Sequence, residues 1–105
     1  MQYRQGDVLL VKLQAGHKDD RRLLARFETG LRLPHRIVAE GEGTGHRHEL
    51  DKGQLTRMGR HLMVSVPDGA VLSHPEHAAL TLPAGEYRVT RQREYTPGGV
   101  RGVWD

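Results

Sequence analysis

Residues 51–69, DKGQLTRMGRHLMVSVPDG, decide the fold class of this chain. Turn-forming residues stand at the start, the middle and the end of the stretch, at 51–53, at Gly59 and at 67–69. Between the last two turns, Leu62, Val64 and Val66 share one strand face, and His61, Met63 and Ser65 share the other. This is the period-two alternation of a strand. The stretch therefore predicts short segments between turns, with one strand at 61–66, as in an antiparallel sheet.

The same spacing of turns continues toward the C-terminus, with signals at Pro75, 83–85 and 97–99. After position 37, only residues 86–96 offer a long segment without Gly or Pro, and Tyr87, Val89 and Tyr95 within it favour a strand. Short segments with regular turns indicate an all-β, mainly antiparallel fold. We predict a small barrel or a sandwich.

The N-terminal third is less regular. Residues 2–13 read as a strand broken at Gly6 and Asp7, and 36–40 read as a short strand. Between them, Leu23, Leu24 and Phe27 have the spacing of one helix face, which predicts one short helix within 18–28. Asp19 or Asp20 is the expected N-cap, and Gly30 and Pro34 end the helical segment.

Length and composition bound the class of protein. The 105 residues fit a single domain over 1–105, and a hydrophobic fraction of 36% predicts a thin core. Such a core is compatible with a homo-oligomer or with a metal that adds stability. The chain has no Cys, which excludes disulfides, thiolate metal sites and cysteine nucleophiles and fits a reducing cytoplasm, where we expect the protein. The longest apolar run, 8–11, is too short for a membrane span, so we expect no membrane association.

The charge balance is weakly basic, with a net charge of +3 and a pI near 9.7. Thirteen of the sixteen basic residues are Arg. This is the charge of a protein with a small nucleic-acid footprint, although a genome whose composition favours Arg codons produces the same bias.

Histidine carries the strongest chemical signal. In Gly45-His46-Arg47-His48-Glu49, the two imidazoles of His46 and His48 project from the same face of an extended strand. His74 and His77 lie in a second short cluster, where Pro75 keeps His74 extended. Convergence of the four side chains would make a nitrogen site for a divalent transition metal, with zinc as the default ion. We predict His46, His48, His74 and His77 as metal ligands.

Other residues near these clusters have different expected roles. Glu76 lies in the turn beside His77 and is the candidate general acid or base. Glu49 points to the opposite strand face from His48. The remaining histidines, His17, His35 and His61, we interpret as solvated surface residues.

The segment 86–95 is rich in Arg and Tyr. Arg88, Arg91, Arg93 and Tyr95 are the candidate substrate-binding residues, because Arg binds phosphate or carboxylate through two hydrogen bonds and Tyr stacks on a base. The alternative is an outer strand on which the Arg stems pack over apolar neighbours.

Several strings resemble a family of short, uncharacterised bacterial proteins. They are QGDVL at 5–9, GEGTGHRH at 41–48, HPEH at 74–77 and YRVTRQREY at 87–95. The resemblance covers nearly the whole chain except 14–35 and implies one coherent bacterial domain, without an activity. A partial resemblance to cupins is also present in the His-X-His after a glycine turn and in Pro83-Ala84-Gly85, although Arg88 stands where the second cupin motif has His.

Two functions follow as expectations. The first is a metal-binding β domain whose histidine site supports hydrolysis of a phosphoester or nucleic acid. The second is a non-catalytic basic module that binds nucleic acid or a protein partner. A structural zinc clip is a third reading.

Overall fold

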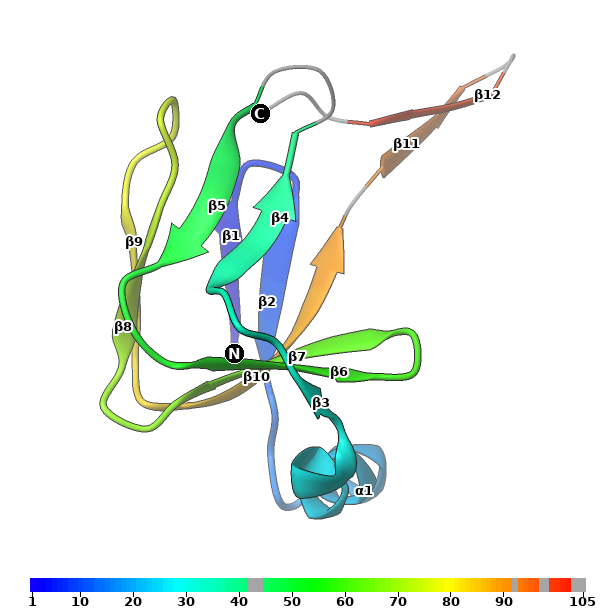
Figure 1. Cartoon of the computed structure of the whole chain (residues 1–105). Helices are drawn as coiled ribbons and strands as arrows, with labels where there is room; N and C mark the ends of the chain where they lie inside the picture. Colours follow the sequence, from blue (N-terminus) through cyan, green and yellow to red (C-terminus); the bar gives the residue numbers. More distant parts are fainter. Residues whose placement is uncertain (42–44, 92, 97–98, 103–105) are drawn as a thin grey trace.

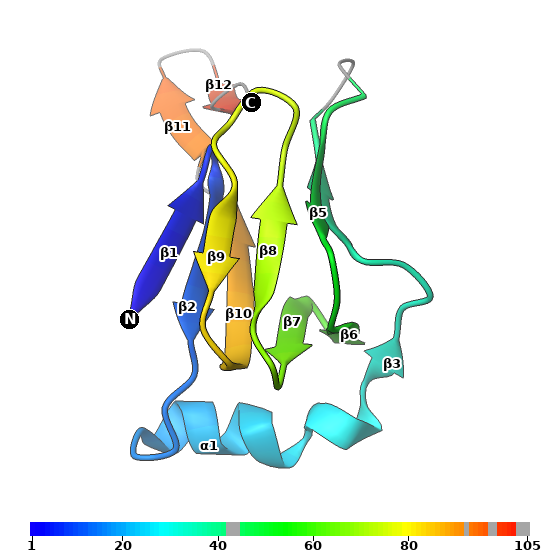
Figure 2. The ribbon, with the colours of Figure 1, turned by 90° about the vertical axis from the view of Figure 1, so that its left-hand side faces the viewer.

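The computed structural model describes residues 1–41, 45–91, 93–96 and 99–102, with side chains described up to Arg91. Two antiparallel sheets face each other, and one helix lies at the end of the molecule (Figures 1 and 2). The all-β, mainly antiparallel fold predicted from the turn spacing is confirmed. Of the two architectures expected, the described residues form the sandwich and not a closed barrel.

The larger sheet has six strands in the order β1-β2-β10-β7-β6-β3. Their bounds are β1 Gln2–Gln5, β2 Val8–Lys12, β10 Gly85–Arg91, β7 His61–Val66, β6 Gln54–Met58 and β3 Leu31–Arg32. The predicted break at Gly6 and Asp7 is the turn of the β1–β2 hairpin, and Gly6 adopts φ 57° there. Residues 51–69 contain the β6–β7 hairpin, in which Met58 pairs with His61.

The smaller sheet has four strands in the order β4-β5-β8-β9. Their bounds are β4 Ile37–Glu40, β5 Arg47–Leu50, β8 Ala70–Ser73 and β9 Leu80–Leu82. Its edge strand β9 lies next to β1, the edge of the larger sheet, as Figure 2 shows. A separate hairpin of β11 (Arg93–Thr96) and β12 (Gly99–Gly102) extends away from both sheets (Figure 1).

The core fills the space between the two sheets. The larger sheet contributes Val8, Leu10, Leu55, Val64, Val66 and Tyr87, and the smaller sheet contributes Val38, Leu50, Ala70, Leu72 and Leu82. Apolar side chains that face each other across two layers are the usual source of stability in a sandwich. The core therefore holds the two sheets at a fixed separation, and the histidine clusters lie at β5 and just after β8, the two inner strands of the smaller sheet.

The short helix lies where the sequence predicts it, but its N-cap is a different residue. Helix α1 spans Lys18–Ala25, and a short 3-10 helix, η1, spans Phe27–Thr29. The N-cap is His17, so the prediction of Asp19 or Asp20 as the cap was wrong. Asp20 instead accepts a hydrogen bond from the Gln14 backbone N–H at 2.9 Å, outside the helix. None of the described helices is long and apolar enough to cross a membrane.

The described parts of the Arg-rich segment belong to β10 and β11, which pair with different neighbours. β10 ends at Arg91, which pairs with Val8, the first residue of β2. Beyond Val8 the chain turns at Gly6 and Asp7, so β10 loses its partner at this point. Among the described strands, the partner of β11 is β12.

Candidate functional site

The structure brings the four predicted histidines together. His46 directly precedes β5 and His48 lies within it, while His74 directly follows β8, the neighbour of β5. The His74 ring centre lies 5.5 Å from that of His46, 4.4 Å from that of His48 and 4.5 Å from that of His77. Two clusters that are separate in sequence thus form one cluster of four imidazoles, which we call the histidine cluster.

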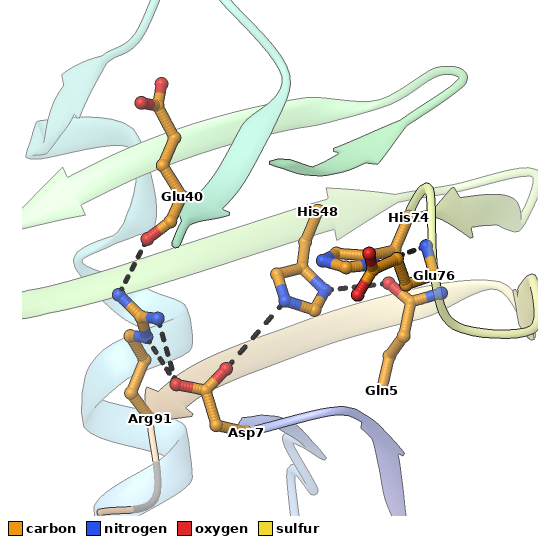
Figure 3. A network of polar contacts seen from close by, with 7 residues as sticks. All are labelled: Gln5, Asp7, Glu40, His48, His74, Glu76 and Arg91. Atoms are coloured by element: carbon orange, nitrogen blue, oxygen red, sulfur yellow. Dashed lines mark hydrogen bonds and ion pairs between the residues drawn. The ribbon is translucent and has the colours of Figure 1, made fainter. Parts of the chain in front are cut away.

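His48 is completely buried, and its orientation is set by Gln5 (Figure 3). The Gln5 side-chain nitrogen donates to two backbone carbonyls, those of Leu72 at 2.8 Å and Ala78 at 2.9 Å. Because carbonyls only accept, the Gln5 oxygen must be the atom that faces His48 Nδ1, at 2.8 Å. His48 Nδ1 therefore carries a proton and donates a hydrogen bond to Gln5 Oε1. In the neutral form of the ring, Nε2 then holds the lone pair.

Asp7 lies on the other side of the His48 ring, as Figure 3 shows. Its Oδ1 atom is 3.8 Å from His48 Nε2, and both side chains are almost completely buried. The Oδ2 atom accepts hydrogen bonds from Arg91, from Nε at 3.0 Å and from Nη2 at 2.9 Å. The Arg91 guanidinium thus compensates the buried carboxylate, whose Oδ1 faces His48 Nε2.

Arg91 also connects this network to the second sheet. Its Nη1 atom donates to the backbone oxygen of Glu40, the last residue of β4, at 3.0 Å. Asp7 comes from the β1–β2 turn, Arg91 from β10 and Glu40 from β4, so the network joins both sheets (Figure 3). Through its contact with Asp7, His48 is connected to this network.

His74 and Glu76 interact within the loop that follows β8. The Glu76 backbone N–H donates to His74 Nδ1 at 3.0 Å, so the neutral His74 ring carries its proton on Nε2. The Glu76 carboxylate is more than half exposed and lies 3.7 Å from His46 Nε2. Of the four histidines, His46 is thus the one beside the predicted acid or base.

The nitrogens of the histidine cluster do not converge on one point. Within the described ranges, no three His, Asp or Glu side chains are arranged so that they could hold a metal ion. The rings of His48 and His77 are nearly parallel, with an angle of 14° and centres 6.1 Å apart. Coordination of one ion would therefore require some of these rings to rotate.

The predicted substrate residues lie in different places. Arg91 points toward Asp7, as described above. Arg88 lies on the opposite face of β10 from Arg91, because successive strand residues alternate, and it is half-buried between its cross-strand neighbours Val11 and Met63. The side chains of Arg93 and Tyr95 lie outside the described residues.

Gln5 and Asp7 are site residues that the sequence analysis missed. Both are polar, both are more than 95% buried, and they flank the glycine of a tight turn. Their signal in the sequence is weak, since Gln-Gly-Asp is an ordinary turn string. Only the pairing of β2 with β10 places Asp7 beside Arg91 and the histidines.

Comparisons with known proteins agree with the expectation of an uncharacterised family. No curated protein and no solved structure matches the chain. One family model matches residues 4–92, which is most of the chain, and it describes a domain of unknown function. The partial likeness to cupins stays a prediction. The chain belongs to the family of this domain of unknown function, DUF8820.

Proposed function

We propose that the histidine cluster binds one divalent transition-metal ion, with zinc as the first ion to test. The observation that carries this proposal is the orientation of His48. A metal-binding imidazole usually donates its other N–H to an oxygen acceptor, which sets the tautomer and raises the basicity of the ligand nitrogen. The His48–Gln5 contact at 2.8 Å supplies this arrangement.

Asp7 is the proposed oxygen donor. Zinc binds imidazole nitrogen and carboxylate oxygen at about 2.0–2.2 Å, so two such ligands of one ion lie at most about 4.2 Å apart. The separation of 3.8 Å between Asp7 Oδ1 and His48 Nε2 is within this limit. A cation between the two atoms would also balance the charge of the carboxylate.

His46 and His77 are the proposed movable ligands. Neither ring is fully buried, and the His46 side chain keeps about a quarter of its surface exposed. His74 is bound to the Glu76 N–H through Nδ1, and it can join the site only by giving up that hydrogen bond. The proposed ligand set is therefore His48 and Asp7, completed by His46 and His77 after rotation of their rings.

The proposed activity is hydrolysis of a phosphoester. A zinc ion held by only three of these four side chains would keep one coordination position open, and it would then supply Lewis-acid chemistry. Glu76 would take and return the proton of the reacting water, because its carboxylate is exposed and lies beside His46.

Metal binding is tested by elemental analysis and titration of protein purified without a His tag. Wild-type protein should hold about one equivalent of zinc, and thermal unfolding should shift upward when zinc, manganese, nickel or iron is added after chelation. His46→Ala should weaken binding, and His48→Ala should abolish it. The matched control is His17→Ala, which removes an exposed imidazole elsewhere. Less than about a tenth of an equivalent of metal, with no thermal shift for any ion, would refute the proposal.

The hydrolytic step has a separate test. The zinc-loaded protein should hydrolyse a nitrophenyl phosphate ester, and Glu76→Gln should reduce the rate by about 100-fold without changing the metal content. An inactive protein that nevertheless binds one equivalent of zinc would leave metal binding standing and reject hydrolysis of this ester.

A further inference from the structure

A second site lies at the opposite end of the molecule from the histidine cluster. A pocket of about 460 Å³ lies between the helical segment and the β6–β7 hairpin. Figure 2 shows α1 at one end of the sandwich, whereas β5 begins and β8 ends at the other. The pocket shares no lining residue with the histidine cluster, so the two sites are independent.

The polar lining of this pocket is strongly basic. Arg26 follows α1, Arg57 lies in β6, and Arg60 and His61 form the end of the β6–β7 hairpin. No Asp or Glu is among the described residues that line the pocket. Three guanidinium groups and one imidazole thus face a common space without a carboxylate.

These guanidinium groups are available to a ligand. Arg26, Arg57 and Arg60 are all exposed. In the part of the chain that the structure describes, none of them forms an ion pair or a side-chain hydrogen bond. Several positive charges around one space make its electrostatic potential positive, which favours an anion there.

The rest of the lining is apolar. Leu23 and Met58 border the same space, together with Leu31, whose surface is 67% exposed. An exposed apolar side chain beside several arginines suits a ligand that has both an anionic group and a flat apolar part. A free inorganic anion would use only the basic portion of this lining.

We infer that this pocket binds the phosphate of a nucleotide unit. Arg recognises phosphate through paired hydrogen bonds, and several arginines match its charge better than they match the single charge of a carboxylate. The sugar or the base would contact Leu31 and Met58. Such a site would bind nucleic acid without a contribution from Arg88, Arg91, Arg93 or Tyr95.

The source of the phosphate is either a nucleic-acid strand or a free nucleotide. The test measures binding of a fluorescent single-stranded oligothymidylate to the full chain at about 50 mM and about 200 mM salt, with AMP and inorganic phosphate as competitors. The variant Arg57→Ala/Arg60→Ala removes two pocket charges. The matched control, Arg4→Ala/Lys52→Ala, removes two exposed charges outside the pocket. Thermal unfolding should show that both variants are folded.

The inference predicts that the pocket variant loses at least about 10-fold in affinity and part of its salt dependence, while the control loses less than about 2-fold. Competition by AMP that exceeds competition by inorganic phosphate would support the contact with the apolar lining. Binding of AMP but not of the oligothymidylate would support a nucleotide site and reject the strand. Equal losses in the two variants, or no binding of any of the three probes, would overturn the inference. Failure of zinc binding would not affect any of these outcomes.

Discussion

Gln5 Oε1 lies 2.8 Å from His48 Nδ1, and this contact determines which nitrogen of His48 carries the proton. The same Gln5 side chain donates to carbonyls on β8 and in the loop after it, so it also ties the first hairpin to the smaller sheet. One buried amide therefore supports both the packing of the sheets and the orientation of the proposed ligand.

Replacement of Gln5 should damage the fold and the site together. Gln5→Leu leaves two carbonyls and one imidazole N–H without their partner, and each buried polar group that loses a partner costs about 1–3 kcal/mol. We expect a loss of at least about 2 kcal/mol in the free energy of unfolding, measured with urea. Zinc affinity, measured by titration, should fall about 10–100-fold, as for other residues that orient metal ligands. Gln14→Leu is the control because Gln14 is exposed, and it should change neither quantity.

Removal of the Arg91 charge should lower the free energy of unfolding, because the buried Asp7 carboxylate loses its counter-charge. The Asp7 carboxylate is 1% exposed and is paired with Arg91 at 2.9 Å. Arg91→Met keeps much of the stem but leaves a buried charge uncompensated, which typically costs about 3 kcal/mol. Urea unfolding should show a loss of this size, and Arg32→Met, at an exposed position in β3, should show almost none.

The double variant Asp7→Asn/Arg91→Met separates charge from packing. Because it removes both charges, it should be less destabilised than the sum of the two single variants. If the two losses were simply additive, the ion pair would not be the reason for the effect of Arg91→Met.

Tyr87 should make the protein sensitive to alkali. Burial raises the pKa of Tyr87 above its ordinary value of 10.0, and the nearby Tyr3 and Glu86 raise it further. The folded state therefore favours the protonated phenol, which donates to the Pro83 carbonyl at 2.6 Å. The stability that depends on this proton is fully present below about pH 10 and is lost as the pH rises through the higher pKa of the folded state.

The measurement is the free energy of unfolding of wild type minus that of Tyr87→Phe, followed from neutral pH to pH 11 or so. The difference should stay constant up to about pH 9 and then decline. Tyr3→Phe is the control, because it keeps Tyr87. The free energy of unfolding of Tyr3→Phe minus that of Tyr87→Phe should therefore also decline at high pH. A difference that does not change with pH would contradict the prediction.

Gly53 should not tolerate a side chain. It adopts φ 106°, and a Cβ atom there would lie 2.6 Å from Val66 Cγ1 and 2.8 Å from the Ser65 carbonyl oxygen. Gly53→Ala should therefore lower the free energy of unfolding by about 1–3 kcal/mol, measured by thermal or urea unfolding. Gly16→Ala is the control, because a Cβ there meets no atom within 4 Å, and its stability should be nearly that of wild type.

The strands could be predicted from the sequence because turns and alternation are local signals. The β6–β7 hairpin and the break at Gly6 and Asp7 both follow from neighbouring residues. The end of β10 at Arg91 could not be predicted, since it depends on where the distant β2 begins. The choice of a sandwich over a barrel likewise depends on which strands pair at the edges.

The residues of the candidate site likewise fall into those that local spacing identifies and those that depend on distant contacts. His46 and His48, like His74 and His77, stand out through their spacing, and the pairing of β5 with β8 brings the two clusters together. Gln5 and Asp7 could not be identified, because they reach His48 and Arg91 across 43 and 84 positions of the chain. The basic pocket was also missed, because Arg26, Arg57 and Arg60 come from separate elements and His61 reads as a surface residue.

The network of Asp7 and Arg91 has a consequence for folding. Contacts between residues far apart in sequence form late, because closing a long loop costs entropy before the contact is made. The bond between positions 7 and 91 requires β1, β2 and β10 to be assembled first, and the Gln5 bonds require the smaller sheet as well. The proposed metal site thus exists only in fully assembled chains, so an ion that binds there would select the native topology and slow its loss.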